Sequence, residues 1–132
     1  MRLWHQTLIP YLDRQRLLGQ HRECAALRGA GWGRKHSTVD YVFTHDPAWL
    51  AAYHSLVMNE MKKRGYHPDK IWYNWDYRGK TLGEQKGWAT DEGRMEAMSR
   101  VNWHKCIYPE HNDAYLKECL DILHSKGVDI EL

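Results

Sequence analysis

The residues best suited to chemistry lie between residues 12 and 29, in a segment that is predicted to be helical. At about 100° per residue, one face of that helix carries a distinctive set of side chains. These are Gln15, Arg16, Gly19, Arg22, Glu23 and Ala26. Gly19 and Ala26 leave room for another backbone to approach, and a carboxylate among arginines suits a site that binds a phosphate backbone and stabilises a cation. The alternative interpretation is a solvent-exposed face with an ordinary ion pair.

The N-terminal segment offers a candidate nucleophile for such a site. Trp4, Leu8 and Ile9 are apolar, so the segment is expected to pack against the body and to fix the position of the α-amine of Met1. An α-amine ordinarily has a pKa of about 7.7–8.0, against about 10.4 for a lysine, so a larger fraction is the free base near neutral pH. Amine nucleophiles form imines with carbonyl carbons, and Glu23 could stabilise positive charge or transfer a proton.

A basic turn follows the helix, with Arg34, Lys35 and His36 after the glycine-containing segment 29–33. Backbone amides of such a turn, together with these side chains, could hold a phosphate. An interpretation that the sequence supports equally well is a helix C-terminal cap followed by a loop. The net charge is only +2, but residues 2–36 hold seven basic and two acidic side chains, whereas the remainder has an acidic excess. A polyanion is therefore a reasonable partner.

Local signals predict the elements that must position these groups. Asp13 begins a first helix that ends near Gly29, Asp46-Pro47 begins a second that ends at Gly65, and Asn112 begins a third. A short helix is expected over residues 90–100. Three helices with long connections rich in tryptophan and tyrosine predict a compact all-α fold, as one domain spanning residues 1–132. The aromatic segment 71–80 is interpreted as a loop pinned to the core, or alternatively as a nucleic-acid contact.

Other classes of site find little support in the sequence. His104, Cys106, His111 and Cys119 do not have the spacing of zinc ligands, so neither a metal nor a cofactor is expected. The three cysteines are widely spaced, and neither a signal peptide nor an apolar run of membrane length is found. We therefore expect a cytoplasmic, nucleoid-associated monomer with reduced thiols and no membrane partner.

Several short motifs, in their order and positions, resemble the pyrimidine-dimer DNA glycosylases related to bacteriophage endonuclease V. The resemblance covers roughly the first half of the chain. It rests on residues 1–4, 11–13, 22–23, 34–36 and 63–66. It implies an all-α fold and a bifunctional glycosylase and abasic-site lyase, in which the amine of the first residue attacks C1′ of the sugar. A glutamate of the first helix assists, and arginines hold the DNA backbone.

Carried onto this sequence, the resemblance assigns catalysis to Met1 and Glu23. The substrate it implies is double-stranded DNA that contains damaged bases. The expected DNA contacts are Arg2, Arg22, Arg28, Arg34, Lys35 and His36. Met1 is expected to be retained, because the enzymes that remove the initiator methionine need a small second residue and Arg2 is large.

Two departures from the phage pattern leave the excised base open. The first residue is not small and hydroxyl-bearing, and Ala26 stands where an arginine is expected one turn beyond Glu23. A glycosylase for another damaged or modified base is therefore an alternative. A non-catalytic DNA- or RNA-binding module with a steep salt dependence is a second. Processing of RNA or of a free nucleoside is a third.

Overall fold

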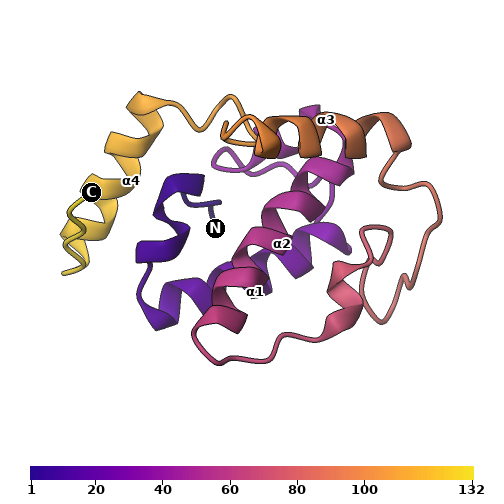
Figure 1. Cartoon of the computed structure of the whole chain (residues 1–132), viewed down its shortest axis with the longest axis horizontal. Helices are drawn as coiled ribbons and strands as arrows, with labels where there is room; N and C mark the ends of the chain where they lie inside the picture. Colours follow the sequence, from indigo (N-terminus) through magenta and orange to yellow (C-terminus); the bar gives the residue numbers. More distant parts are fainter.

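The computed structural model describes all 132 residues and is built from helices (Figure 1). No strand is present, and a single isolated bridge joins Tyr77 to Glu84. The elements are η1 (Gln6–Tyr11), α1 (Arg14–Arg28), η2 (Asp40–Thr44), α2 (Pro47–Lys63), η3 (Lys70–Tyr73), α3 (Asp91–Asn102) and α4 (Asp113–Ser125), where η denotes a 3₁₀-helix. The all-α expectation is confirmed. None of the helices combines the length and the apolar character that crossing a bilayer requires.

Local sequence signals account for where the helices begin. The Asp46 carboxylate accepts from the backbone N–H of Ala48 at 2.8 Å, and Asn112 caps α4 in the same way at 2.9 Å. Helix α3 is longer than the short helix expected over residues 90–100, so the fold has four α-helices where the sequence indicates three principal ones. Its buried face consists of Gly93 and Ala97, which give almost no hydrophobic periodicity to detect.

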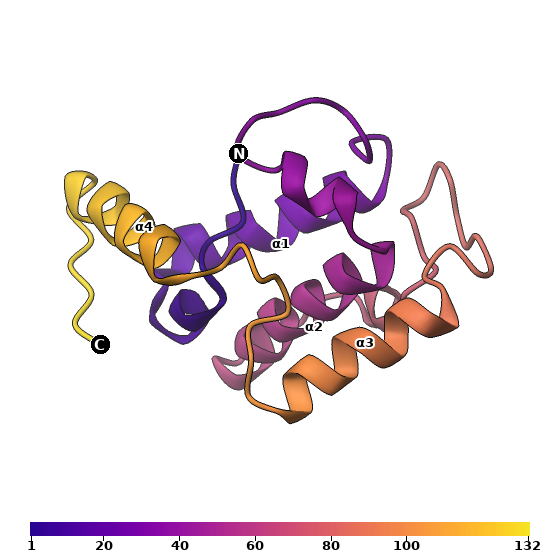
Figure 2. The same ribbon diagram turned by 90° about the horizontal axis from the view of Figure 1, so that it is seen from above.

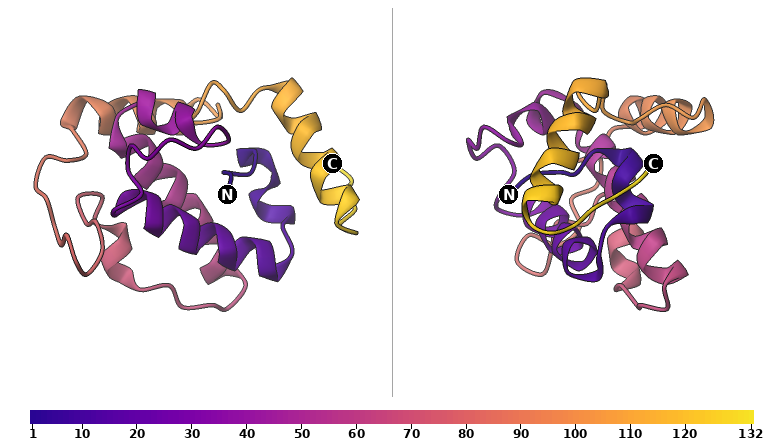
Figure 3. Two further views of the ribbon diagram at one scale, coloured as in Figure 1. Left: turned by 180° about the vertical axis from the view of Figure 1, so that it is seen from behind. Right: turned by 90° about the vertical axis from the view of Figure 1, so that its left-hand side faces the viewer.

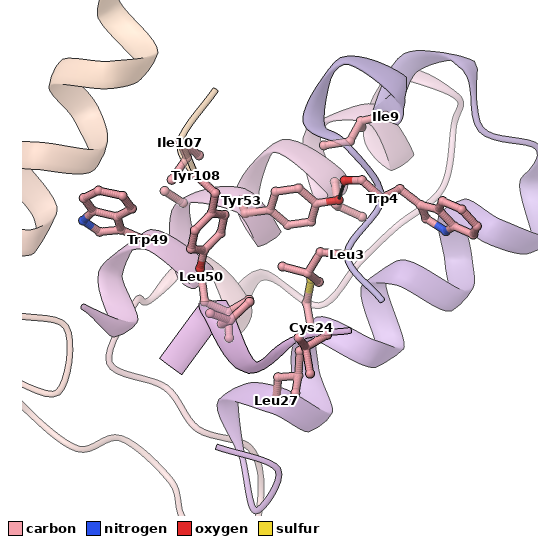
Figure 4. Packing of buried hydrophobic residues seen from close by; sticks show 14 of the residues in the cluster. Leu3, Trp4, Ile9, Cys24, Leu27, Trp49, Leu50, Tyr53, Ile107 and Tyr108 are labelled. Atoms are coloured by element: carbon pink, nitrogen blue, oxygen red, sulfur yellow. Dashed lines mark hydrogen bonds between the residues drawn. The ribbon is translucent and has the colours of Figure 1, made fainter. Parts of the chain in front are cut away.

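The core forms where α1, α3 and η1 pack against α2 (Figure 2). Leu50, Tyr53 and Val57 of α2 are fully buried in it. Leu3 is likewise fully buried and Trp4 is 8 % exposed, so these two residues before η1 belong to the core (Figure 4), whereas Met1 is 48 % exposed. We call residues 1–4 the N-terminal arm, and its packing agrees with the apolar residues that predict it.

The aromatic segment 71–80 covers the C-terminal end of α1. Arg78 Nε donates to the carbonyl of Arg28 at 2.9 Å, while the Arg28 guanidinium donates to the carbonyls of Trp72 and Asn74, each at 2.8 Å. The Arg78 guanidinium also lies 4.5 Å from the ring centre of Trp88. The interpretation of this segment as a pinned loop is therefore confirmed.

Helix α4 lies beside the N-terminal arm and η1, on the side away from α2 and α3 (Figures 1 and 3). Its N-terminal half contacts the arm directly: the Tyr115 hydroxyl donates to the carbonyl of Leu3, and Glu118 forms an ion pair with Arg2 at 3.1 Å. The arm therefore lies between α1 on one side and α4 on the other.

Candidate active site

The N-terminal arm is held by its backbone. Each of its four successive carbonyl groups accepts a hydrogen bond from a side chain of a different part of the chain. The donors are Thr38 to Met1, Gln20 to Arg2 at 3.0 Å, Tyr115 to Leu3, and Tyr53 to Trp4 at 2.6 Å. An extended segment bound at every residue has little freedom to move, so the α-amine at its end has a defined position.

Gln20 of α1 connects the arm to Glu23. Its side chain is 1 % exposed, and its oxygen accepts from the Trp4 N–H at 2.7 Å. Its amide nitrogen lies 3.1 Å from Glu23 Oε2 and 3.0 Å from the carbonyl oxygen of Arg2. The same residue therefore orients the carboxylate and the backbone of the arm.

The Glu23 carboxylate and the α-amine of Met1 belong to one electrostatic environment. Burial raises the pKa of Glu23, and the positive charges of the α-amine and of Arg22, with the nearby Arg2 N–H, offset part of that rise. The amine and the carboxylate do not form a direct ion pair within 4.0 Å. Met1 and Glu23 both line a pocket with an internal volume of about 450 Å³.

Besides the N-terminal arm, which contributes Met1, Arg2 and Trp4, three parts of the chain form the walls of this pocket. Helix α1 contributes the face expected from its periodicity: Gln15, Arg16, Gly19, Arg22 and Glu23. The loop before η2 contributes His36 and Thr38, and α4 contributes Ile122, with Lys126 just beyond its end. A methyl group added at Gly19 would lie 3.7 Å from the Arg22 guanidinium, its nearest neighbour beyond its own helix backbone, so the bare strip of α1 opens into the pocket.

A second hollow, of about 260 Å³, adjoins the first and shares Met1 and His36 with it. Leu27 and Val39 contribute to its apolar lining, and Arg34 and Lys35 lie at its edge. Arg34, Lys35 and His36 are exposed. The structure therefore brings the basic turn next to Met1, although the two are more than thirty residues apart in the chain.

Arg28 does not lie on this surface. It is fully buried, and its guanidinium binds two loop carbonyls and His54 Nδ1, the last at 3.0 Å. Burial lowers the pKa of Arg28 to about 10, so the group stays charged at neutral pH and holds the end of α1 to segment 72–74. This corrects the expectation that Arg28 contacts DNA. Arg2 is only partly available, since its guanidinium is paired with Glu118 and lies 5.7 Å from the Tyr115 ring centre.

Sequence reasoning missed the residues that hold the arm. Gln20, Thr38, Tyr53 and Tyr115 are ordinary polar residues in the sequence, and only the fold shows that they converge on four adjacent peptides. Gln20 gives a signal, because it is a polar residue on the face of α1 that carries Leu17, Cys24 and Leu27; Arg28 is the other polar residue buried in this helix. Nothing in the sequence links Lys126 to the site, which it reaches only through the position of α4.

No group of three or more His, Cys, Asp or Glu side chains is placed to hold a metal ion. The three cysteines are free, and burial raises the pKa of each thiol.

Comparison with known proteins identifies the N-terminal part of the chain. The model of a protein family described as pyrimidine dimer DNA glycosylase matches residues 1–74. This range contains the N-terminal arm, α1, α2 and the basic turn, whereas α3 and α4 lie beyond it. Comparisons with curated proteins and with solved structures gave no match.

Proposed function

The chain belongs to the pyrimidine dimer DNA glycosylase family, and from this premise we propose that the α-amine of Met1 is the nucleophile of a combined glycosylase and abasic-site lyase. The substrate is double-stranded DNA that contains a damaged pyrimidine site. The observation that carries the proposal is the arm itself: side chains bind each of its four carbonyl groups, and Met1 lines a pocket that Glu23 and three arginines (Arg2, Arg16 and Arg22) also line.

The first step is displacement of the base. The free amine attacks C1′ of the deoxyribose, a bond forms between the α-nitrogen and C1′, and the bond from C1′ to the base breaks. The base leaves with the electron pair of that bond and takes up a proton. Glu23 stabilises the positive charge that develops on the sugar, since charge stabilisation is strongest where water is excluded and Glu23 is half-buried.

The second step opens the sugar. The α-nitrogen loses one proton, its lone pair displaces O4′, and O4′ takes up a proton, which leaves a protonated imine between Met1 and C1′. Removal of a proton from C2′ then expels the 3′ phosphate and breaks the strand. Glu23 can carry these protons because burial raises the pKa of its carboxyl toward the working pH.

The DNA backbone is held by the basic side chains around the pocket. Arg22 and the Arg34–His36 turn are exposed on either side of Met1, and Arg16 and Lys126 extend the same surface. Contacts of this type give affinity that falls steeply with salt and carry little sequence information. Any such enzyme must also expose a nucleotide from the stack, and the pocket and its neighbouring hollow offer space for it.

Trapping with borohydride tests the proposal directly. The protein is mixed with a duplex that contains one abasic site, the imine is reduced, and the adduct is mapped by peptide mass. We expect a covalent adduct at Met1, loss of the adduct when the α-amine is acetylated, and a loss of roughly 100-fold or more in trapping rate for Glu23→Gln. Glu96→Gln on the exposed face of α3 is the matched control.

The mass of the mature protein must first show that Met1 is its first residue. An untagged protein that binds the duplex but forms no adduct would contradict the proposal and favour a non-catalytic DNA-binding module. An adduct that maps to a lysine would contradict the assignment of the nucleophile while leaving lyase activity in place.

A further inference from the structure

Helix α4 lies outside the part of the chain that matches the family model, yet it contacts the N-terminal arm next to the candidate nucleophile. The family match ends at residue 74, and α4 begins at Asp113. Its contacts fall on Arg2 and Leu3, the two residues that follow Met1. A helix outside the matched residues therefore contacts the segment that carries the amine.

Two side chains of α4 make these contacts, one turn apart. The Tyr115 hydroxyl donates to the carbonyl oxygen of Leu3, and Glu118 Oε2 lies 3.1 Å from Arg2 Nη1. The Arg2 guanidinium also lies over the Tyr115 ring, 5.7 Å from its centre. Together they bind both the backbone and the side chain of the arm from the side opposite to Gln20.

Tyr115 is itself fixed by a buried cluster of rings. His111 Nδ1 accepts from the Gln6 N–H at 2.9 Å, so its other nitrogen carries the proton and faces the Tyr41 hydroxyl at 2.7 Å. The His111 ring lies 5.1 Å from the Tyr115 ring, and the His5 ring lies 5.3 Å from that of His111. The Tyr115 hydroxyl is therefore a positioned donor rather than a mobile surface group.

We propose that Tyr115 and Glu118 are positioning residues, which hold the N-terminal arm from the side of α4 so that the α-amine of Met1 faces Glu23. This inference rests on the proposed function. The contacts from α1 and α2 bind one edge of the arm, and those from α4 prevent it from turning about its own axis. A nucleophile displaced by about 1 Å commonly loses on the order of 100-fold in rate, so modest contacts have a large effect here.

The test compares Tyr115→Phe, Glu118→Gln and Glu118→Asp with the wild-type protein. Tyr73→Phe is the matched control, because it also removes one tyrosine hydroxyl. That hydroxyl donates to Asn59 Oδ1 at 2.8 Å, and neither residue lines the pocket. We expect the rate of borohydride trapping to fall roughly tenfold or more for Tyr115→Phe and Glu118→Gln. We expect Glu118→Asp to recover part of the rate, and Tyr73→Phe to match the wild type.

Two further measurements separate positioning from a general loss of stability. Affinity for a duplex with an uncleavable tetrahydrofuran abasic analogue should not weaken in Tyr115→Phe or Glu118→Gln, since Arg16 and Arg22 keep their surroundings and Arg2 keeps its charge. The acidic limb of the pH–rate profile should move to higher pH in Tyr115→Phe, because the pKa of Glu23 rises further when the amine that partly offsets its burial moves away.

Heteronuclear NOE values of the Arg2 and Leu3 amides report on the arm without any reaction. They should fall in Tyr115→Phe and Glu118→Gln and stay unchanged in Tyr73→Phe. If the wild type forms the adduct, and the Tyr115 and Glu118 variants match it in trapping rate, pH dependence and NOE values, then the positioning role is wrong and the proposed function stands. If the wild type gives no adduct, the proposed function fails and the claim that these residues position a nucleophile fails with it. The NOE values then still show whether α4 immobilises the arm.

Discussion

Gln20 places its side-chain amide between Glu23 and the N-terminal arm, 3.1 Å from the Glu23 carboxylate and 3.0 Å from the carbonyl oxygen of Arg2. A single buried residue therefore sets the spacing between the candidate carboxylate and the segment that carries the candidate nucleophile. Because the Gln20 oxygen also accepts from the Trp4 N–H at 2.7 Å, a change at this position affects folding and chemistry together.

Replacing Gln20 with Met should lower both stability and activity. The variant has a similar size but leaves the buried Trp4 N–H without its partner, which costs about 1–3 kcal/mol in free energy of unfolding. Glu23 also loses the donor that orients it, so trapping on abasic DNA should fall by roughly tenfold or more. Urea denaturation and trapping rates measure the two effects. Gln15→Met, on the exposed part of α1, should leave the free energy of unfolding unchanged; a stable Gln20→Met variant would contradict the role of this residue.

Substitutions of Arg28 and Arg34 should distinguish a residue that stabilises the fold from one that binds DNA. Arg28→Met removes the donor of two partly buried carbonyls and of His54 Nδ1, although His54 Nε2 keeps its contact with His21. The free energy of unfolding should therefore fall by about 3 kcal/mol or more. Arg34→Ala removes an exposed side chain and should change it by less than about 0.5 kcal/mol.

DNA binding should depend on Arg34, whose replacement has little effect on the free energy of unfolding. Arg34→Ala should weaken binding to a duplex and lower the slope of log affinity against log salt by about 1. Equal salt slopes for Arg34→Ala and the wild type would show that the basic turn does not touch phosphate.

His111 should make the fold less stable in acid. Burial lowers the pKa of His111 to about 3, so below the ordinary histidine pKa of about 6.5 the unfolded chain binds a proton that the folded chain does not. The free energy of unfolding should therefore fall as the pH drops from 6.5 to 5, by about 1–2 kcal/mol from this group.

Denaturation at a series of pH values measures this dependence. His111→Gln should show a flatter decline over that range, and the exposed His67→Gln should keep the wild-type slope. A His111→Gln profile parallel to that of the wild type would mean that other groups cause the loss.

Gly93 should tolerate no side chain. A methyl group at this position would lie 2.3 Å from Asp46 Cγ, and Asp46 both caps α2 and binds the Thr90 N–H at 3.2 Å. Gly93→Ala should therefore lower the free energy of unfolding by about 1–3 kcal/mol, although alanine favours helix. Gly19→Ala meets no such neighbour and should raise it by about 0.5–1 kcal/mol through helix propensity. Thermal unfolding of the two variants measures these opposite changes in stability. A stabilised Gly93→Ala would show that α3 can shift away from α2.

What could be predicted from the sequence is what depends on neighbours in the chain. The caps at Asp46 and Asn112 and the pocket-facing side of α1 follow from local hydrogen bonding and helical periodicity, and the structure agrees with them. The structural role of Arg28 could not be predicted, because its partners are the backbone carbonyls of residues 72 and 74. Every residue has a backbone carbonyl, so the sequence does not indicate which of them an arginine will bind. The contact of Tyr115 with the arm could not be predicted for the same reason, because its acceptor is the carbonyl of Leu3.

The wall formed by Ile122 and Lys126 lies in a stretch that the family model does not reach. Substitutions there can alter the shape of the cavity without touching Glu23 or the first residue. The C-terminal part of the chain is therefore expected to govern which base fits the cavity, separately from the candidate reacting groups of the N-terminal part.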